Sequence, residues 1–325
     1  MAAYALVSAM VVAVMPWFGA TETSPRQVLA QWRAGATAEY QFEIFTSQRV
    51  PRVLLGFVIG AALGMAGAAF QVILRNPLAT PYTLGVASAG ALAAAASLVM
   101  PALQFALGPF SNVHVCAFAG SGMAAVFIYC VARRSRRLST NVLVLAGVAV
   151  NLFCGSALLL VRFIADPQHL VQVDRWLMGG LITVGWRDIG SVLPFAVAGG
   201  VLILIESHAL NQLAFGEDVA GARGVSVQRV LTTTFIGSVL LTTGAVAVAG
   251  PIGFVGLVVP HCVRLLSGPD QRVVLPASGL LAGALLAACD TLARSCIAPT
   301  ELPVGIITAC LGAPVFLFLL LKRAG

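Results

Sequence analysis

Long apolar runs separated by short polar connections make up most of the chain, and this alternation limits the fold more than any other feature. A helix needs about 20 consecutive, mostly apolar residues to cross a bilayer, and runs such as 51–74 and 142–165 are long enough. Hydrophobic residues make up 59% of the 325 residues and charged residues 10%, so too little polar surface remains to cover a soluble domain. We therefore predict an all-α integral membrane protein that forms a single polytopic transmembrane domain over residues 1–325.

The apolar runs predict about ten transmembrane helices. The first run lacks a basic start and a convincing cleavage site, so we interpret it as a retained span and not as a signal peptide. Arginines at 133, 134, 136 and 137 follow the fourth run and indicate a cytoplasmic end, which places both termini in the cytoplasm. The predicted spans are 3–20, 51–74, 83–101, 113–132, 142–165, 188–206, 230–250, 252–265, 274–296 and 303–321.

Small residues and helix breakers occur inside several of these runs. Glycines at 56, 60, 64 and 67 have the spacing that lets transmembrane helices pack closely. The run 250–265 is short and contains Pro251 and Pro260, so we expect a broken helix there. A broken helix at membrane depth is tolerated only where protein or a water-filled cavity surrounds it. This run therefore points to a pathway through the protein.

The longest polar segment in the second half of the chain is 207–229. We predict two short helices in it, at about 210–215 and 217–223, because acids follow Gly216 and Arg223 precedes Gly224, as in a short helix with a satisfied dipole. Such helices are too short and too polar to cross a bilayer, yet Leu210, Leu213, Val219 and Ala222 give them an apolar side for packing. The alternative is an ordinary solvated loop.

The chain lacks the patterns that catalytic or metal sites require. A phosphate-binding loop needs G-x-x-x-x-G-K-[ST], and the only lysine is Lys322, near the carboxyl end. The 4 histidines are far apart and fit no ligand spacing. The 7 cysteines include no C-x-x-C pair, and the basic residues are scattered at the ends of apolar runs. We therefore expect no enzyme activity, no nucleic-acid binding, and no metal or cofactor bound by this chain.

A proton-coupled or sodium-coupled transporter is expected to carry carboxylates within its spans. Only Asp290 qualifies, and Arg294 lies four residues later, where it can neutralise the carboxylate. We interpret this pair as structural or as lying near the outer surface, and a coupling role is the alternative.

Three stretches of sequence resemble the permease subunits of bacterial ABC importers for iron-siderophores, heme and cobalamin. The first is RVPRVLLGFVIGAALGMAGAAFQVILRNPLATPYTLGVASAGAL at 49–92, and the second joins LVLAGVAVN at 143–151 to WLMGGL at 176–181. The third combines the polar segment with AVAVAGPIGFVGLVVPHCVRLLSGPDQR at 245–272 and ELPVGIITACLGAPVFLFLLLKR at 301–323. These stretches are similar to the family in order and spacing, whereas residues 1–48 carry no such match.

The resemblance implies a homodimer of ten-helix subunits in the bacterial inner membrane, with one translocation path on its two-fold axis. It also implies two cytoplasmic ATPase subunits, which use ATP and Mg, and a periplasmic substrate-binding protein. In the family, a segment similar to LAFGEDVAGARG forms coupling helices that sit in a cleft of the ATPase subunit. The coupling residues carried over to this chain are Leu213, Phe215, Gly216, Glu217, Asp218, Arg223 and Gly224.

The resemblance assigns roles to two further sets of residues. The first set is Arg49, Arg52 and Arg294, which match positions that meet acidic residues of the binding protein. A guanidinium suits this role, since it can hold a carboxylate bidentately. The alternative for each arginine is snorkelling to lipid phosphate. The predicted cytoplasmic gate comprises Asn76, Leu78, Thr140 and Asn141, and Asn141 replaces a small hydroxyl residue that is common there. Alternatively, Asn76 simply caps a helix end and stabilises its turn.

No residue in the sequence specifies the cargo. The breadth of the family favours heme or a ferric siderophore over cobalamin, and His169 in an outer polar segment is weak support for heme. A different class of function also fits some features, namely a self-sufficient secondary transporter or channel with broken helices near Pro251 and Pro303. The polar segment 207–229 and the scarcity of carboxylates in the spans favour the importer.

Overall fold

The computed structural model describes residues 1–19, 24–34, 40–103, 111–134, 138–181, 185–297 and 300–324, and every regular element in these ranges is helical. The α-helices are α1 (Ala2–Val14), α2 (Pro25–Arg33), α3 (Tyr40–Ile44), α4 (Val50–Ile73), α5 (Val86–Val99), α6 (Asn112–Ala132), α7 (Thr140–Ile164), α8 (Pro167–Leu177), α9 (Arg187–Ile205), α10 (Ser207–Leu213), α11 (Glu217–Ala222), α12 (Val227–Ala249), α13 (Val255–Ser267), α14 (Gln271–Ser295) and α15 (Val304–Ala324). Short 3₁₀ turns occur at Met15–Trp17 and Pro101–Leu103, and a π-type turn at Phe45–Arg49 leads into α4. The predicted all-α class is confirmed for the described residues.

Each of the ten predicted spans contains a helix, but the helices differ in length. Among the described residues, six helical stretches are long and apolar enough to cross a membrane, and four other apolar helices are shorter. The six are Tyr40–Ile73, Asn112–Ala132, Thr140–Ile164, Arg187–Ile205, Val227–Ala249 and Gln271–Ser295. The structure therefore supports a polytopic membrane protein, and the number of ten crossings stays a prediction.

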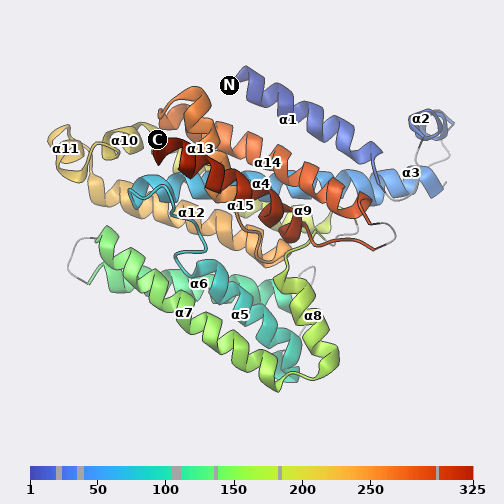
Figure 1. Ribbon diagram of the computed structural model, residues 1–325, viewed down its shortest axis with the longest axis horizontal. Helices are drawn as coiled ribbons and strands as arrows, with labels where there is room; N and C mark the ends of the chain where they lie inside the picture. The colour runs from blue at the N-terminus through green and yellow to red at the C-terminus, as the bar shows by residue number, and fades with distance from the viewer. Residues whose placement is uncertain are drawn as a thin grey trace.

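Helix α4 forms the centre of the molecule and packs most extensively on α14, with α12, α13 and α9 also against it (Figure 1). Its glycines allow these close approaches. A Cβ atom added at Gly60 would lie 2.4 Å from the carbonyl oxygen of Ala282, and one at Gly67 would lie 1.9 Å from that of Gly256. The predicted role of the α4 glycines in helix packing is confirmed, because no larger residue fits at these two positions.

The irregular segment at the predicted broken helix lies before α13 and not inside it. Helix α12 ends at Ala249, and the chain turns through Gly250 and Phe254, which have φ angles of 68° and 66°. Helix α13 then continues through Pro260. Because proline lacks an N–H group, the carbonyl of Gly256 one turn earlier loses its helical donor. Gln71 Nε2 compensates by donating to the carbonyl oxygens of Gly256 and Leu257 at 3.4 and 3.3 Å.

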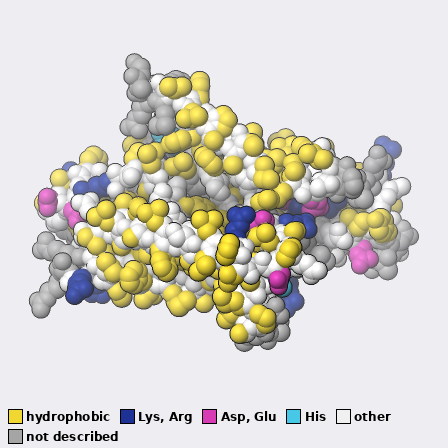
Figure 2. Space-filling model, turned by 60° about the horizontal axis from the view of Figure 1, so that its bottom comes forward, with side chains coloured by type: hydrophobic (Ala, Val, Ile, Leu, Met, Phe, Trp, Pro, Cys, Tyr) yellow, Lys and Arg dark blue, Asp and Glu magenta, His cyan; other side chains and the backbone are white. Residues whose placement is uncertain are grey.

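Helices α5, α6 and α7 form a second layer beside α12, and α8 packs against α5. Helix α7 buries little of its surface and exposes Leu145, Leu152, Phe153 and Phe163. Figure 2 shows hydrophobic side chains over much of the visible face of the molecule. Such a surface needs lipid or another protein to cover it, as expected for a membrane subunit.

The predicted inner connections gather at one end of the molecule and the predicted outer ones at the opposite end (Figure 1). Helices α10 and α11 share the first end with the start of α1 and the end of α15, whereas α2 and α3 lie at the other. This agrees with the predicted alternation of the spans. Which end faces the cytoplasm stays a prediction, and Arg136 and Arg137, which contributed to it, lie outside the described residues.

We expect Gly67→Ala to lower the apparent melting temperature of the purified protein in detergent, since the Cβ atom of the new alanine forces α4 away from the backbone of Gly256. Overpacking of this kind costs about 1–3 kcal/mol. Gly122→Ala in α6 is the matched control, because a Cβ there meets no atom within 4 Å and alanine favours helix over glycine. Equal melting temperatures for the two variants would contradict the packing described for α4.

Candidate coupling and gate region

The polar segment folds into two short helices, as predicted. They are α10 and α11, and α10 begins three residues before the predicted start, at Ser207. Gly216 precedes α11 with a φ of 119°, and Gly224 follows it with a φ of 81°. Only glycine adopts these backbone conformations without strain. The tight turns expected at both glycines are therefore present.

One side of this segment packs into the subunit and the other is exposed. Leu210, Leu213 and Ala220 are fully buried. Val219, expected on the packed side, is exposed instead, and Phe215 exposes 71% of its surface. Leu213 therefore anchors the segment and does not present a surface to a partner, whereas Phe215 and Val219 do.

Glu217 connects α11 to two other parts of the chain. Its Oε1 atom accepts a hydrogen bond from Arg75 Nη2 at 2.7 Å and a longer one from Thr140 Oγ1 at 3.5 Å. Arg75 directly precedes Asn76, the first residue of the NPLA turn at 76–79, which we call the gate turn. Thr140 is the first residue of α7. One carboxylate thus joins the polar segment 207–229, which we call the coupling segment, to both predicted gate elements. The sequence did not reveal this link, because the three residues are far apart along the chain.

The gate residues lie at the same end of the molecule as α11. Asn76 Oδ1 accepts from the Leu78 N–H at 2.9 Å, so Asn76 stabilises its own turn, as the alternative interpretation expected. The Leu78 and Asn141 side chains are exposed. Whether these residues narrow a transport path stays a prediction.

A second tie joins α10 to the start of α14. Asn211 Nδ2 donates to Asp270 Oδ1 at 2.7 Å, and Asn211 Oδ1 accepts from the Gln271 N–H at 2.7 Å. Hydrogen bonds from Arg272 and then from Asn211 hold the pKa of the Asp270 carboxyl well below its ordinary value. The carboxylate therefore stays ionised at neutral pH and keeps its position at the beginning of α14.

Arg223 and Phe215 lie together on the exposed side of the coupling segment. The Arg223 guanidinium lies 5.7 Å from the centre of the Phe215 ring, and its Nη1 donates to Gln212 Oε1. Asp218 is exposed nearby and has no hydrogen-bonding or ionic partner among the described residues. These three residues form a mixed aromatic and charged face that a partner can contact.

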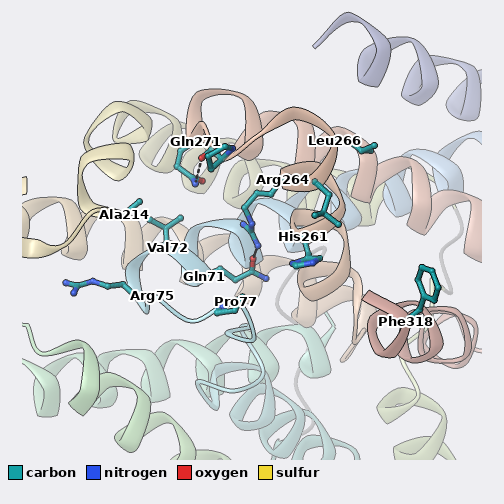
Figure 3. A pocket seen from close by; sticks show the side chains of 12 residues that line it. Gln71, Val72, Arg75, Pro77, Ala214, His261, Arg264, Leu266, Gln271 and Phe318 are labelled. Atoms are coloured by element: carbon teal, nitrogen blue, oxygen red, sulfur yellow. Dashed lines mark hydrogen bonds between the residues drawn. The ribbon is translucent and has the colours of Figure 1, made fainter. Parts of the chain in front are cut away.

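A cavity of about 980 Å³ adjoins the coupling segment (Figure 3). Ala214, between α10 and α11, forms part of its wall, and so does Pro77 in the gate turn. Arg264 of α13 points toward Gln71 of α4 and donates to its Oε1 atom. The cavity therefore borders the coupling segment and the gate turn together.

At the opposite end, Arg52 forms the ion pair with Asp290 that the sequence assigned to Arg294, and a second one with Glu301. Arg52 Nε and Nη2 hold both oxygens of Asp290 at 2.9 and 3.0 Å, and Arg52 Nη1 reaches Glu301 at 2.8 Å. Arg294 Nη2 donates to Thr291 Oγ1 at 3.2 Å instead. The expected i to i+4 pair is replaced because α4 packs closely along α14 and brings Arg52 to Asp290.

All three predicted docking arginines are engaged within the subunit. Arg49 exposes 4% of its surface and Arg294 6%. Arg49 Nη1 donates to the carbonyl oxygens of Pro16 and Trp17, at 3.4 and 3.2 Å. Such burial does not suit snorkelling to lipid phosphate. Contact with a binding protein stays a prediction.

Comparison with known families identifies the chain. The FecCD transport family matches residues 5–322. The chain belongs to the FecCD transport family. The match begins well before residue 49, so the amino-terminal part, which carries no motif noticed in the sequence, also belongs to the family fold. FecCD proteins are transport permeases, which agrees with the expectation that the chain itself is not an enzyme.

Two curated FecCD relatives are similar over most of this chain. The cobalamin import system permease of Halobacterium salinarum is 41% identical over 275 residues, which cover 85% of this chain and 72% of that protein. The hemin transport system permease of Yersinia pestis is 38% identical over 295 residues, covering 89% and 86%. A solved structure described as an inward-facing conformation of a candidate metal-chelate type ABC transporter aligns with a TM-score of 0.83 and 26% identity, covering 98% of this chain and 97% of that one.

We expect Asp290→Ala to destabilise this FecCD protein far more than Glu301→Ala does. Asp290 exposes 1% of its side chain, and removing one partner of a buried ion pair costs about 3–5 kcal/mol. Glu301 exposes 49% of its side chain, and an exposed ion pair contributes about 0–1 kcal/mol. Thermal unfolding of the two variants in detergent measures the difference. Equal losses of melting temperature would show that the buried Asp290 pair stabilises the protein no more than the exposed Glu301 pair.

Proposed function

We propose that this FecCD protein is the membrane-spanning permease subunit of an ATP-driven importer. It moves an iron chelate from a periplasmic binding protein to the cytoplasm by alternating access. The observation that carries this proposal is the position of Glu217, which contacts Arg75 beside the gate turn and Thr140 at the start of α7. A displacement of α11 is thereby passed to both gate elements.

The energy for transport comes from a separate protein in this proposal. Two cytoplasmic ATPase subunits bind ATP and Mg and contact the exposed face of Phe215, Asp218 and Arg223 on each of two permease copies. The buried side chains of Leu210 and Leu213 fix α10 to the subunit, so movement of the ATPase shifts the helices above as a rigid unit. The permease binds no cofactor itself.

The outer end receives the cargo from the binding protein. In this proposal the subunit lies in the inner membrane of a bacterium, and the α10–α11 end and both termini face the cytoplasm. Arg52 is the docking arginine with the most accessible partner, because Glu301 is half exposed whereas Asp290 is buried. An acidic group of a binding protein reaches Arg52 by replacing Glu301.

A self-sufficient secondary transporter or channel is the alternative function. Such a transporter needs a carboxylate that gains and loses a proton or a sodium ion during transport. Asp290 is buried, and both of its carboxylate oxygens accept hydrogen bonds from Arg52, which suits a structural role. A secondary transporter also does not require a cytoplasmic segment in contact with the gate elements, so the Glu217 contacts support the importer.

The cargo we propose is an iron chelate, with heme or a ferric siderophore ahead of cobalamin. The named relatives import hemin and cobalamin, which are both large metal chelates. A further relative, from Bacillus subtilis, is an iron(3+)-hydroxamate import system permease with 32% identity over 312 residues.

Proteoliposomes that contain the permease, its ATPase and its binding protein provide the test. We expect Glu217→Gln to lower ATP-driven uptake by up to about fivefold while ATP hydrolysis continues, because the ion pair with Arg75 is partly exposed and such a pair contributes about 0–1 kcal/mol. Arg75→Gln should cause a similar loss, and the double variant should lose little more, since both changes break the same contact.

Asp166→Asn is the control, because this carboxylate is 85% exposed at the opposite end of the molecule. Uptake in Glu217→Gln equal to that of the control would remove the support from the coupling contact. Uptake by the permease alone, driven by an ion gradient, would replace the importer with the secondary transporter.

A further inference from the structure

The cavity beside the coupling segment has a lining that suits one chemical class of cargo. Its wall includes Ala214 between α10 and α11, Pro77 in the gate turn, and Phe318 on α15 (Figure 3). Movement of the coupling segment or of the gate turn therefore changes the shape of this space. In the proposed importer, this cavity lies at the cytoplasmic end, beside the predicted gate turn.

The polar part of the wall is basic. Arg75, His261 and Arg264 contribute side chains, and the described lining residues include no acid. Arg75 extends away toward Glu217, with which it forms an ion pair, so Arg264 supplies the positive charge nearest the centre of the cavity. His261 lies next to it on α13, one turn earlier.

The guanidinium of Arg264 is held in a fixed position. It donates to Gln71 Oε1, and Gln71 is anchored in turn by Nε2 contacts to the carbonyls of Gly256 and Leu257. Gln71 is buried, with 5% exposure. A fixed guanidinium recognises carboxylate and similar anions better than a mobile one, because less side-chain freedom is lost on binding.

The rim of the cavity is apolar. Leu265, Leu266 and Phe318 line it, and each exposes more than half of its surface. Such side chains favour a flat or bulky apolar group. A basic wall and an apolar rim together fit a molecule that has anionic groups on an apolar body.

We propose that this cavity is an exit vestibule that favours anionic, amphipathic iron chelates, with Arg264 contacting the anionic groups of the cargo. This inference rests on the proposed importer function and narrows its cargo class. Heme, with two carboxylates on an apolar macrocycle, fits the lining, as does an iron chelate with carboxylate groups. A chelate without anionic groups gains nothing from Arg264.

Binding of hemin to the full permease in nanodiscs of uncharged phosphatidylcholine tests the proposal. We expect Arg264→Gln to weaken hemin binding about tenfold, the scale of one hydrogen bond to a charged group, and Arg264→Lys to weaken it less because the charge remains. The dimethyl ester of hemin, which lacks carboxylates, should bind more weakly to the unaltered protein and equally to all variants.

Arg162→Gln is the matched control, since Arg162 is a partly exposed arginine paired with Asp174 at the other end of the molecule. Melting temperatures confirm that each variant is folded. Equal binding of hemin and its dimethyl ester, or unchanged hemin binding in Arg264→Gln, would overturn the proposal. So would loss of hemin binding in nanodiscs with phosphatidylglycerol, because the cavity would then be a site for anionic lipid.

The cargo class and the importer function can fail separately. ATP-driven uptake of hemin that depends on Glu217 and is unaffected by Arg264→Gln would leave the importer intact and reject the vestibule. Loss of ATP dependence for every chelate would reject the importer itself. Hemin uptake that depends on ATP and falls in Arg264→Gln supports both.

Discussion

Close backbone contact between α4 and its neighbours is the constraint on which the rest of the structure depends. Apolar helices gain no hydrophobic energy from each other in lipid, so they associate through packing that requires small residues. Gly60 and Gly67 bring α4 against the backbones of α14 and α13. At that separation Arg52 reaches Asp290, and Gln71 reaches the carbonyls beside Pro260. Packing thereby decides which polar groups find partners.

Buried backbone groups in the middle of the protein impose the second constraint. Irregular backbone at membrane depth must be satisfied by protein, since lipid offers no hydrogen bonds. The segment between α12 and α13 meets this requirement through Gly180, whose N–H donates to the Ala249 carbonyl at 2.9 Å, and through Tyr82, whose hydroxyl accepts from the Ile252 N–H. The Gly305 N–H donates to the Gly179 carbonyl at 3.3 Å and ties the start of α15 to the same region.

Charge is used differently at the two ends of the molecule. At one end, Arg52 holds a buried and a half-exposed carboxylate and fixes α4 to α14. At the other, Glu217 accepts from the exposed Arg75 and from the half-buried Thr140, which lie on different elements. The first arrangement is rigid and costly to break, whereas the second is exposed to solvent and can rearrange at little cost. Such a difference suits a subunit that keeps one end packed and transmits motion at the other.

The sequence by itself determined the class, the approximate helix positions, the two short helices of the polar segment and the family, because hydropathy, glycine placement and motif order are properties of neighbouring residues. The expected interruption of the run 250–265 lies at its beginning, beside Pro251. The sequence assigned Asp290 the wrong partner, and it gave no hint of the Glu217 contacts or of the basic cavity around Arg264. Only the tertiary structure decided these features. Their partners lie on separate helices, and which helices meet depends on how their surfaces pack, which local pattern does not record.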